Sequence, residues 1–247
     1  MKAMILAAGE GTRLRPLTVD QPKPMLPVAA KPALEYTVRW LRYYGIREIL
    51  INLHHRPEGV MRHMGDGASF GVSIEYSLEE RIMGTAGGAK LREDFFSGSF
   101  VVVYGDVLTD LDLSFLIGYH ESRTVLPHLT MSLYREPNPE RCGVACVNDQ
   151  GLVSRFVEKP MPGQAPSDLA SAGVLVVDRE ILQYIPKHRF YDYGRDLFPL
   201  LLRDAVPMFG WLLPESTYLI DFGTPENYAR AQREWPTRRA RMFLRDN

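Results

Sequence analysis

The sequence is poor in cysteine, with Cys142 and Cys146 as the only two among 247 residues. If their segment RCGVACV is extended as a strand, four residues span about 13 Å, farther than the ~7 Å that a disulfide allows between Cα atoms. We therefore expect no bridge between them. We also expect no metal site there, because no histidine or further cysteine stands at ligand spacing, and the six histidines show no metal-binding spacing elsewhere.

No charge sign dominates the chain, and no apolar run is long enough to cross a membrane. The formal net charge is −1, which excludes the strongly basic balance typical of nucleic-acid-binding proteins. The apolar run from Lys2 to Ala8 ends in a glycine-rich segment, well short of the ~18 residues of a membrane span and of a signal peptide's apolar region. We expect a cytoplasmic protein with neither a nucleic-acid nor a membrane partner.

Apolar runs and amphipathic stripes alternate along the chain. The segments 2–8, 32–45 and 48–53 predict a strand, a helix and a strand, which together form a βαβ unit. This pattern predicts an α/β fold: a mixed, mainly parallel sheet with helices on both faces and an antiparallel portion in the second half. Further strands are expected at 72–76, 100–104, 129–134, 143–147, 152–158, 172–177, 207–213 and 217–220, and further helices at 57–64, 85–95, 112–121, 198–204 and 225–235.

A glycine-rich loop follows the first expected strand, in the segment LAAGEGTRLRPLT. Gly9 and Gly11 would let the backbone approach a phosphate closely, and successive N–H groups can form an anion-binding nest. Arg13, and Lys23 in the proline-rich QPKPMLP, add positive charge. The loop matches neither the G-x-G-x-x-G motif nor the P-loop. It predicts a triphosphate cradle, with a plain glycine turn and solvated arginines as the alternative.

Two carboxylates follow expected strands, as Asp106 follows FVVVY and Asp221 follows YLI. Strand ends of this kind meet at the ligand-binding edge of open α/β sheets. Mg²⁺ prefers one or two carboxylates together with phosphate oxygens and water. A helix cap or a turn is the alternative role for each aspartate.

Several motifs occur in a fixed order. They are GEGTRLRPLT with PKPMLPV, EERIMGTAGGAK, VYGDVLTDLDL, RCGVA, FVEKP, SAGVLV, YDYGRDLFPLLL and YLIDFGTPENY. Together they resemble the sugar-1-phosphate nucleotidyltransferases over nearly the whole chain, most closely the short mannose-1-phosphate guanylyltransferase type. The resemblance implies a Rossmann-like nucleotide-diphospho-sugar transferase fold. It further implies one domain over 1–247, with a nucleotide-binding half at about 1–110, a sugar-phosphate-binding half at about 111–247, and no C-terminal β-helix.

The resemblance implies a reaction in which a nucleoside triphosphate and a sugar 1-phosphate give a nucleotide-sugar and pyrophosphate. The attacking phosphate oxygen is already an anion, so the protein's task is to position two anions and to stabilise charge. Asp106 and Asp221 would then hold Mg²⁺ as the cofactor. Arg13 and Lys23 would contact the triphosphate, and these four residues form the implied catalytic set.

The resemblance also assigns binding residues. The implied nucleotide-binding residues are Leu6, Ala7, Ala8, Gly9, Gly11, Thr12, Arg13, Glu79, Gly84 and Thr85. Glu79 or Glu80 would read the edge of the base. A carboxylate accepts two donors and so suits the adjacent N1–H and N2–H₂ of guanine, which favours GTP and leaves thymidine or uridine triphosphate as alternatives.

The implied sugar-phosphate-binding residues are Gly143, Glu158, Lys159 and Gly173. Gly143 and Gly173 are isolated strand glycines that would equally mark β-bulges. Cys142, Ser171 and Leu175 depart from residues common in the family. These departures lie in the sugar half, so mannose 1-phosphate, a heptose 1-phosphate, glucose 1-phosphate and amino sugar 1-phosphates all stay open as substrates.

Two other functional classes compete with this hypothesis. The Asp110-Leu-Asp112 pattern resembles the metal-binding D-x-D of glycosyltransferases, although we favour Asp112 as a helix cap. A catalytically silent sensor of nucleotide-sugars would bind without turnover, but Arg13, Lys23 and the two aspartates are all present. Apart from its two substrates, the expected partner is a second copy of the chain in a homodimer.

Overall fold

The computed structural model describes the backbone of residues 1–243 and the side chains of residues 1–238. The contacts divide the chain into two compact units. Unit 1 contains residues 83–102 and 112–215, and unit 2 contains residues 2–82, 103–111 and 216 onward. These units differ from the sequential halves expected around residue 110, because the chain enters unit 1 early and returns to unit 2 at its end.

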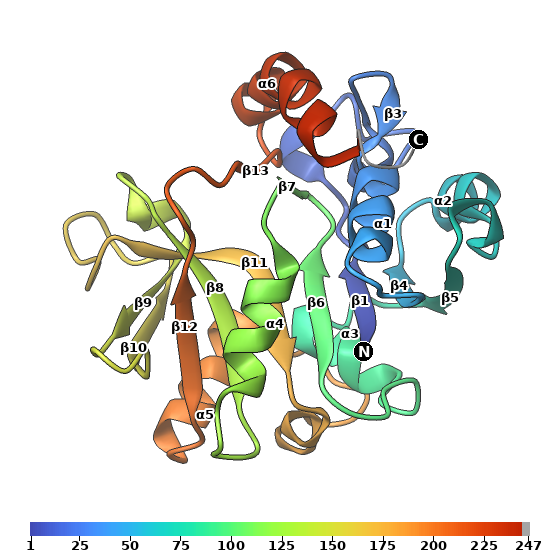
Figure 1. Ribbon diagram of the computed structural model, residues 1–247. Coiled ribbons are helices and arrows are strands. Elements are labelled where there is room, and N and C mark those ends of the chain that lie inside the picture. Colours follow the sequence, from blue (N-terminus) through green and yellow to red (C-terminus); the bar gives the residue numbers. More distant parts are fainter. Residues whose placement is uncertain (244–247) are drawn as a thin grey trace. The chain divides into compact units, whose positions relative to one another are not determined.

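Unit 2 carries the parallel part of the sheet. Its strand order is β6, β1, β4, β5, and β1 pairs with β4 and β4 with β5 in parallel register. The helices α1 and α2 connect these strands, as the sequence predicted (Figure 1). The elements of this unit are β1 (Lys2–Leu6), β2 (Pro27–Val28), β3 (Lys31–Pro32), α1 (Ala33–Tyr43), β4 (Glu48–Leu53), α2 (Pro57–Met64), β5 (Ser73–Leu78), the end of β6 (Phe100–Tyr104), β7 (Val107–Thr109), β13 (Leu219–Asp221) and α6 (Pro225–Phe243).

The strands and the first helix of unit 2 bury the apolar residues that the sequence pattern assigned to the core. The middle residues of β1 are fully buried, and β4 is buried after its first residue, as expected for parallel strands covered on both faces. The apolar stripe of α1 packs inward, with Leu34, Val38 and Leu41 all at 0% exposure. Trp40 on the same helix donates its indole N–H to the carbonyl of Leu111 at 2.9 Å, so the helix is tied down by both packing and a buried hydrogen bond.

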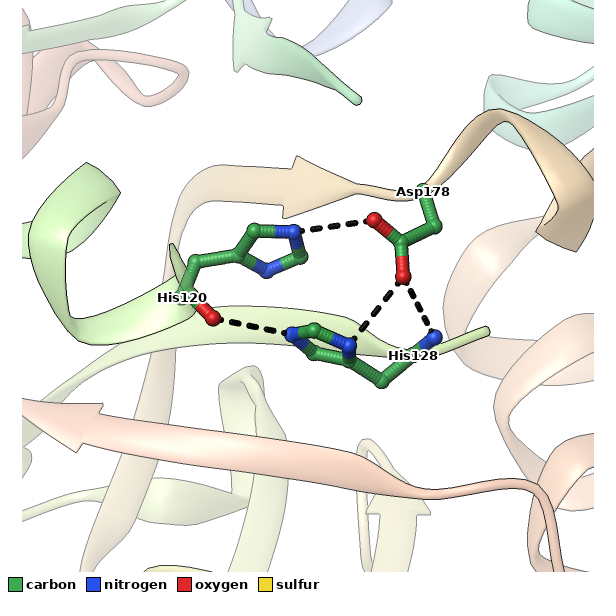
Figure 2. A group of neighbouring side chains, drawn as sticks. All are labelled: His120, His128 and Asp178. Carbon is green, nitrogen blue, oxygen red and sulfur yellow. Dashed lines mark hydrogen bonds and ion pairs between the residues drawn. The ribbon is translucent and has the colours of Figure 1, made fainter. Parts of the chain in front are cut away.

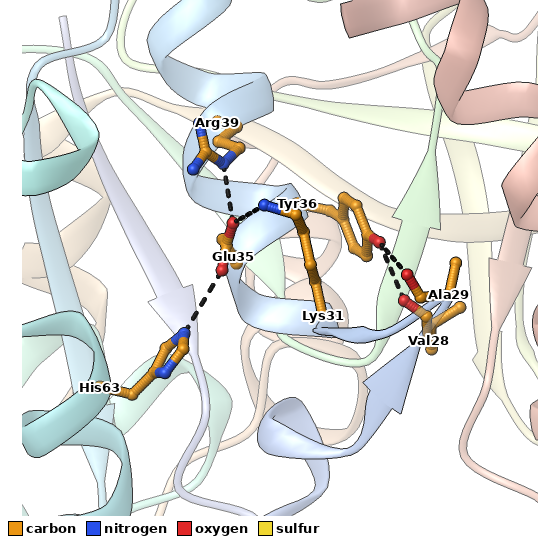
Figure 3. A network of polar contacts seen from close by, with 7 residues as sticks. All are labelled: Val28, Ala29, Lys31, Glu35, Tyr36, Arg39 and His63. Carbon is orange, nitrogen blue, oxygen red and sulfur yellow. Dashed lines mark hydrogen bonds and ion pairs between the residues drawn. The ribbon is translucent and has the colours of Figure 1, made fainter.

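A buried carboxylate on α1 organises the surrounding charges (Figure 3). Glu35 Oε1 accepts from Lys31 Nζ at 2.8 Å and from Arg39 Nε at 3.0 Å, and Oε2 lies 3.4 Å from His63 Nε2. Burial alone raises the pKa of Glu35, but the hydrogen bonds and charges of Lys31 and Arg39 outweigh it and bring the pKa below its ordinary value. Glu35 thereby links α1 to the end of the long first loop and to α2.

A short hairpin closes the first loop, where the sequence predicted only irregular chain. The strands β2 and β3 pair through Pro27 with Pro32 and Val28 with Lys31. The hydroxyl of Tyr36 donates to the carbonyl of Val28 at 2.9 Å (Figure 3). This hairpin is two residues a side and rich in proline, so strand periodicity could not reveal it.

Unit 1 holds the antiparallel pairs of the large sheet. Its strand order is β10, β9, β11, β6, and β8 pairs with β11 in antiparallel and with β12 in parallel register. Figure 1 shows α4 beside β8. The elements of unit 1 are α3 (Thr85–Leu91), the start of β6, α4 (Leu113–Glu121), β8 (Leu129–Arg135), β9 (Gly143–Val147), β10 (Val153–Glu158), β11 (Leu169–Val177), a π-helix (Tyr193–Leu197), α5 (Phe198–Arg203) and β12 (Met208–Leu212).

The observed architecture confirms the expected class, a mixed α/β sheet flanked by helices with its antiparallel pairs in the second half of the chain. The last helix differs from expectation, because α6 continues through Pro236 to Phe243. Trp235 anchors it: this residue is 1% exposed and makes edge and tilted ring contacts with Tyr36 and Tyr218. Among the described residues, none of the helices combines the length and the apolar character needed to cross a bilayer.

A buried polar cluster ties α4 to β8 and β11 within unit 1 (Figure 2). Asp178 Oδ1 accepts from Ser99 Oγ at 2.7 Å and from His120 Nε2 at 3.1 Å, and Oδ2 accepts from the backbone N–H of His128 at 2.7 Å. The His128 ring nitrogen Nδ1 lies 3.1 Å from Oδ2. Candidate ligand atoms of His120, His128 and Asp178 lie within 4.8 Å of one another, a grouping that the spacing of the histidines along the sequence did not reveal.

The charge of Asp178 is stabilised by these donors. Burial by itself raises the pKa of Asp178, but the hydrogen bonds from His120 and His128 outweigh it, so the pKa lies far below its ordinary range. Because the folded pKa is depressed, the stabilisation is present above the unfolded pKa of about 4 and is lost as the pH falls below it.

We predict that Asp178→Asn lowers the free energy of unfolding by about 3 kcal/mol near neutral pH, since it removes the charged acceptor of several buried hydrogen bonds. The gap between variant and wild type should shrink as the pH falls below about 4. Urea unfolding over a pH series measures both effects. Asp168→Asn is the control, because Asp168 pairs with Arg135 on the surface, where loss of the pair should cost less than about 1 kcal/mol. If the difference in unfolding free energy between variant and wild type did not change with pH, Asp178 would not have a depressed pKa in the folded protein.

Candidate active site

The glycine-rich loop leaves β1 and makes a 3₁₀ turn over Thr12–Leu14. Gly11 precedes the turn at φ +64°, and a Cβ there would lie 3.0 Å from Thr18 Cγ2. The hydroxyl of Thr18 donates to the carbonyl of Gly11 at 2.7 Å. The fold itself therefore requires a glycine at position 11. A Cβ on Gly9 would meet none of the described atoms within 4 Å, so the fold leaves this glycine's surroundings open.

Asp106 and Asp221 lie on neighbouring strand ends, although 114 positions separate them in the sequence. Asp106 follows β6, and β7 then pairs antiparallel with β13, with Val107 opposite Asp221. The N–H of Phe222 donates to the carbonyl of Asp106 at 3.0 Å. Lys23 forms an ion pair with Asp106 Oδ2. The pairing of β7 with β13 thus brings the two carboxylates together beside the lysine.

Gly223 allows the positive side chains to close around Asp221. A Cβ at Gly223 would lie 2.7 Å from Asp221 Oδ1, 2.8 Å from Arg13 Nη2 and 3.1 Å from Lys23 Nζ. The N–H of Gly223 donates to Asp221 Oδ1 at 2.7 Å. Gly223 was not predicted from the sequence, although it stands in the motif DFGTPEN. Three residues of the expected catalytic set, Arg13, Lys23 and Asp221, therefore converge on one glycine in unit 2, and Asp106 joins them through its ion pair with Lys23.

The pKa values of the two carboxylates shift in opposite directions. Burial raises the pKa of Asp106, but the charge and hydrogen bond of Lys23 outweigh it and the net shift is downward. Part of Asp221 reaches the surface, yet its carboxyl group packs against Gly223, Arg13 and Lys23. This desolvation, with the repulsion of Asp106, raises the pKa of Asp221 to about 6.

This cluster fits a divalent cation. Lys23 pairs with Asp106, while desolvation and the negative charge of Asp106 keep the pKa of Asp221 raised. An added cation would relieve that repulsion, and two carboxylates are the donor set that Mg²⁺ prefers when phosphate oxygens and water complete its shell. Asp106 and Asp221 are thus the residues that would hold the metal.

The expected base-binding residues of unit 2 lie at the ends of β1 and β5. Ala7 and Ala8 are 3% and 6% exposed, and Glu79 is 5% exposed, whereas Glu80 is exposed. The two glutamates that the sequence left open thus differ in burial, and which of them reads the base stays a prediction. Glu79 Oε1 accepts from Asn52 Nδ2 at 2.8 Å. Asn52 was not selected from the sequence, where an asparagine inside the strand ILINL carries no motif.

Gly84 and Thr85 belong to unit 1 and are engaged there with the segment before the π-helix. Gly84 has φ +78°, and a Cβ on it would lie 2.4 Å from the carbonyl oxygen of Tyr191. The hydroxyl of Thr85 donates to Asp192 Oδ2 at 2.9 Å and accepts from the N–H of Tyr193 at 2.9 Å. Both residues shape this segment, and their contact with a nucleotide stays a prediction.

Glu158 occupies a close-packed position at the end of β10 in unit 1. A Cβ on Gly143 would lie 2.6 Å from Glu158 Oε2, and a Cβ on Gly194 would lie 2.5 Å from the same atom. Gly194 belongs to the π-helix, a rare element that often marks functional sites. Desolvation raises the pKa of Glu158, with Lys159 opposing the shift. The sequence analysis missed Gly194, although it lies in the motif YDYGRD.

Lys159 follows Glu158 in a backbone conformation that is uncommon outside glycine, at φ +50°. Its side chain is 54% exposed, and Nζ lies 3.9 Å from Glu158 Oε1. Gly173 has φ +72° and lies where the register of β11 on β8 shifts between Ser171 and Leu175. Gly173 is therefore a bulge residue, one of the two roles that the sequence allowed.

The D-x-D pattern serves the fold. Asp112 caps α4 by accepting from the N–H of Ser114 at 3.0 Å, which confirms the expected cap. Asp110 Oδ1 accepts from the N–H of Tyr218 at 2.6 Å. Both carboxylates thus have structural partners.

The structure places the predicted residues in two groups. In unit 2 lie Leu6, Ala7, Ala8, Gly9, Gly11, Thr12, Arg13, Lys23, Glu79, Asp106 and Asp221, and in unit 1 lie Gly84, Thr85, Gly143, Glu158, Lys159 and Gly173.

We predict that Lys23→Met makes stability more dependent on pH. Without the ammonium, burial and repulsion raise the pKa of both aspartates, so folding becomes less favourable as the pH rises through these pKa values. Relative to wild type, the variant should lose about 2 kcal/mol more stability at about pH 8 than at about pH 5, or roughly 4–8 °C in Tm. Thermal unfolding across this range measures it.

Lys31→Met is the matched control, because Lys31 also pairs with a carboxylate but is 45% exposed and shares Glu35 with Arg39. Its Tm difference from wild type should stay nearly constant over the same range. An equally flat profile for Lys23→Met would remove Lys23 as the group that neutralises Asp106.

Comparison with known proteins supports one family. The profile of the family described as Nucleotidyl transferase matches residues 2–238. The chain is 37% identical over 221 residues to a UTP–glucose-1-phosphate uridylyltransferase of Synechocystis, covering 85% of this chain and 57% of that protein. It is 35% identical over 234 residues to a mannose-1-phosphate guanylyltransferase of Mycobacterium tuberculosis, covering 92% of this chain and 62% of that protein.

A solved structure gives the same result. A Bacillus anthracis protein assigned as a glucose-1-phosphate thymidylyltransferase matches with a TM-score of 0.84 and 28% identity, covering 94% of both chains. The present chain spans about three fifths of the length of the curated relatives named above. On the match over residues 2–238 and these identities, the chain belongs to the nucleotidyl transferase family, as its motifs implied.

Proposed function

We propose that this protein transfers a nucleotidyl group from a nucleoside triphosphate to a sugar 1-phosphate, releasing pyrophosphate, in a Mg²⁺-dependent reaction. GTP is the favoured nucleotide, and mannose 1-phosphate or a similar sugar phosphate is the favoured acceptor. The observation that carries the proposal is the convergence of Arg13, Lys23 and Asp221 on Gly223, with Asp106 paired to Lys23. A plain glycine turn would not need two carboxylates and two cations gathered in one place.

The residues of unit 2 suit the triphosphate end of this reaction. Arg13 offers a planar, permanently charged donor group, and Lys23 offers a compact charge that can leave Asp106 for a phosphate. Mg²⁺ held by Asp106 and Asp221 would neutralise negative charge on the phosphates and the leaving pyrophosphate. The attacking group is already an anion, so the protein contributes positioning and charge rather than a nucleophile.

The residues of unit 1 suit a sugar phosphate. The Glu158 carboxylate lies against Gly143 and Gly194, and a carboxylate so placed can accept hydrogen bonds from sugar hydroxyls. Lys159 adjoins it with an exposed ammonium group for the phosphate. The left-handed backbone of Lys159 is the kind of local strain found where a side chain must be aimed.

A second candidate function uses a different nucleotide base and a different sugar. The uridylyltransferase of Synechocystis is 37% identical to the chain, and the Bacillus anthracis protein assigned as a thymidylyltransferase shares its fold closely. These matches favour transfer from uridine or thymidine triphosphate to glucose 1-phosphate, and an amino sugar 1-phosphate is the other acceptor that the sequence leaves open. We place either activity in the cytoplasm, where nucleoside triphosphates are the available donors.

Pyrophosphate release tests the proposal directly. The purified protein is mixed with Mg²⁺, each common nucleoside triphosphate and a panel of sugar 1-phosphates. We expect release with one preferred pair and loss of release when Mg²⁺ is chelated. Binding of nucleotide-sugars without turnover would instead establish a silent sensor.

Asp106→Asn and Asp221→Asn should each lower kcat by about 10³-fold or more while the protein stays folded, because each removes a charge that would hold the metal. Asp110→Asn is the matched control, since Asp110 lies at a neighbouring strand end but accepts a backbone N–H, which an asparagine oxygen can also do. Full activity in either of the first two variants would exclude the metal assignment. Loss of activity in the control alone would point to the D-x-D instead.

Lys159→Met should raise the KM for sugar 1-phosphate by about tenfold or more, a loss of roughly 1.4 kcal/mol of binding, with the KM for the nucleotide nearly unchanged. Steady-state kinetics with each substrate varied in turn measures the split. Lys187→Met serves as control, because Lys187 is an exposed lysine of the same unit that pairs with Glu93. If Lys159→Met changed only the KM for the nucleotide, Lys159 would be assigned to the nucleotide instead of the sugar phosphate.

A further inference from the structure

Three neighbouring strands of unit 2 meet at one buried asparagine. Asn52 lies in β4, with Leu6 of β1 and Ser77 of β5 opposite it in the parallel register. The residue is 2% exposed. Its side chain therefore lies at the junction of the chain segments that leave β1 and β5.

The side chain of Asn52 joins these two segments. The backbone N–H of Ala7 donates to Asn52 Oδ1 at 2.8 Å, and Asn52 Nδ2 donates to Glu79 Oε1 at 2.8 Å. Next to them, His54 Nδ1 lies 2.7 Å from the carbonyl oxygen of Glu79. The Asn52 amide thus links the backbone of Ala7, after β1, to the carboxylate of Glu79, after β5.

The orientation of this amide follows from its partners. A backbone N–H can only donate, so the oxygen of Asn52 must face Ala7 and its NH₂ group must face Glu79. The NH₂ group only donates, so the atom of Glu79 that faces it must accept. An aspartate at position 52 would face Glu79 with an oxygen, and a leucine would leave the Ala7 N–H and Glu79 without this partner, each at the cost of a buried polar contact.

We propose that Asn52 is the positioning residue for base recognition, holding the Glu79 carboxylate as an acceptor for the two adjacent N–H donors of guanine. The inference rests on the proposed function and on the sequence-based expectation that Ala7, Ala8 and Gly9 bind the nucleotide and that Glu79 reads the edge of its base. A glutamate has three rotatable side-chain bonds, so fixing its carboxylate before the base arrives removes an entropic cost of binding. Asn52 acts through Glu79 and does not itself contact the nucleotide.

The pair GTP and ITP isolates this contact, because hypoxanthine keeps the N1–H of guanine but lacks its 2-amino group. We expect the wild-type kcat/KM for GTP to exceed that for ITP by about tenfold or more, and Asn52→Asp to bring the ratio close to one. Glu79→Gln should lower the ratio in the same way. In the Glu79→Gln background, Asn52→Asp should change it no further, which is the result expected of a residue that acts through its neighbour.

Ser132→Ala is the control for a merely structural effect. Ser132 is 0% exposed and its hydroxyl donates to the carbonyl of Val174 at 2.7 Å. Its loss should lower Tm and leave the GTP to ITP ratio unchanged. Asn52→Leu, which is apolar and similar in size, replaces Asn52→Asp if that variant does not fold.

The outcomes separate the inference from the proposed function. A wild-type protein that releases no pyrophosphate with any pair contradicts the proposed function itself. Release with a pyrimidine nucleotide but not with GTP retains the reaction and overturns the guanine assignment. In the third outcome, Asn52→Asp lowers Tm as the control does but keeps the wild-type preference for GTP over ITP. That result retains the reaction and the guanine assignment, and it shows that Asn52 is only structural.

Discussion

The site in unit 2 depends on a balance between two neighbouring carboxylates and one lysine. Asp106 and Asp221 would repel each other if both stood ionised in a desolvated position. Lys23 relieves that repulsion on one side, which lowers the pKa of Asp106, while Asp221 keeps a pKa near 6. The arrangement is therefore prepared for further positive charge, and the loop carrying Lys23 must hold its position for the balance to exist.

Glycine is the second means by which this fold gathers charge. Gly223 lets Arg13, Lys23 and Asp221 converge in unit 2, and in unit 1 Gly143 and Gly194 both lie against the Glu158 carboxylate. At each place a Cβ would come closer to the functional group than real Cβ atoms allow. The absence of a side chain thus creates space for a charged one, which explains why glycines recur inside the motifs rather than only in their turns.

The elements with clear periodicity were predictable, and those stabilised by distant contacts were not. The strand Glu48–Leu53 and the helix Pro57–Met64 have the bounds expected from their apolar patterns. Three elements were missed because they depend on contacts from other parts of the chain. The β2–β3 hairpin depends on Tyr36, and the π-helix depends on Asp192. The continuation of α6 beyond Trp235 depends on ring packing. Propensity is a local property, and these elements form where tertiary contacts override it.

The sequence by itself determined the family, the fold class and most of the candidate residues, because motifs such as GEGTRLRPLT and FVEKP combine residue type with spacing. Only the tertiary structure decided which residues lie together. Asp106 meets Asp221 because β7 pairs with β13, Asn52 meets Glu79 because β4 adjoins β5, and His120 meets Asp178 inside unit 1. The physical reason is that charge, hydrogen bonding and desolvation act over a few ångströms, and strand pairing sets which residues come within that distance.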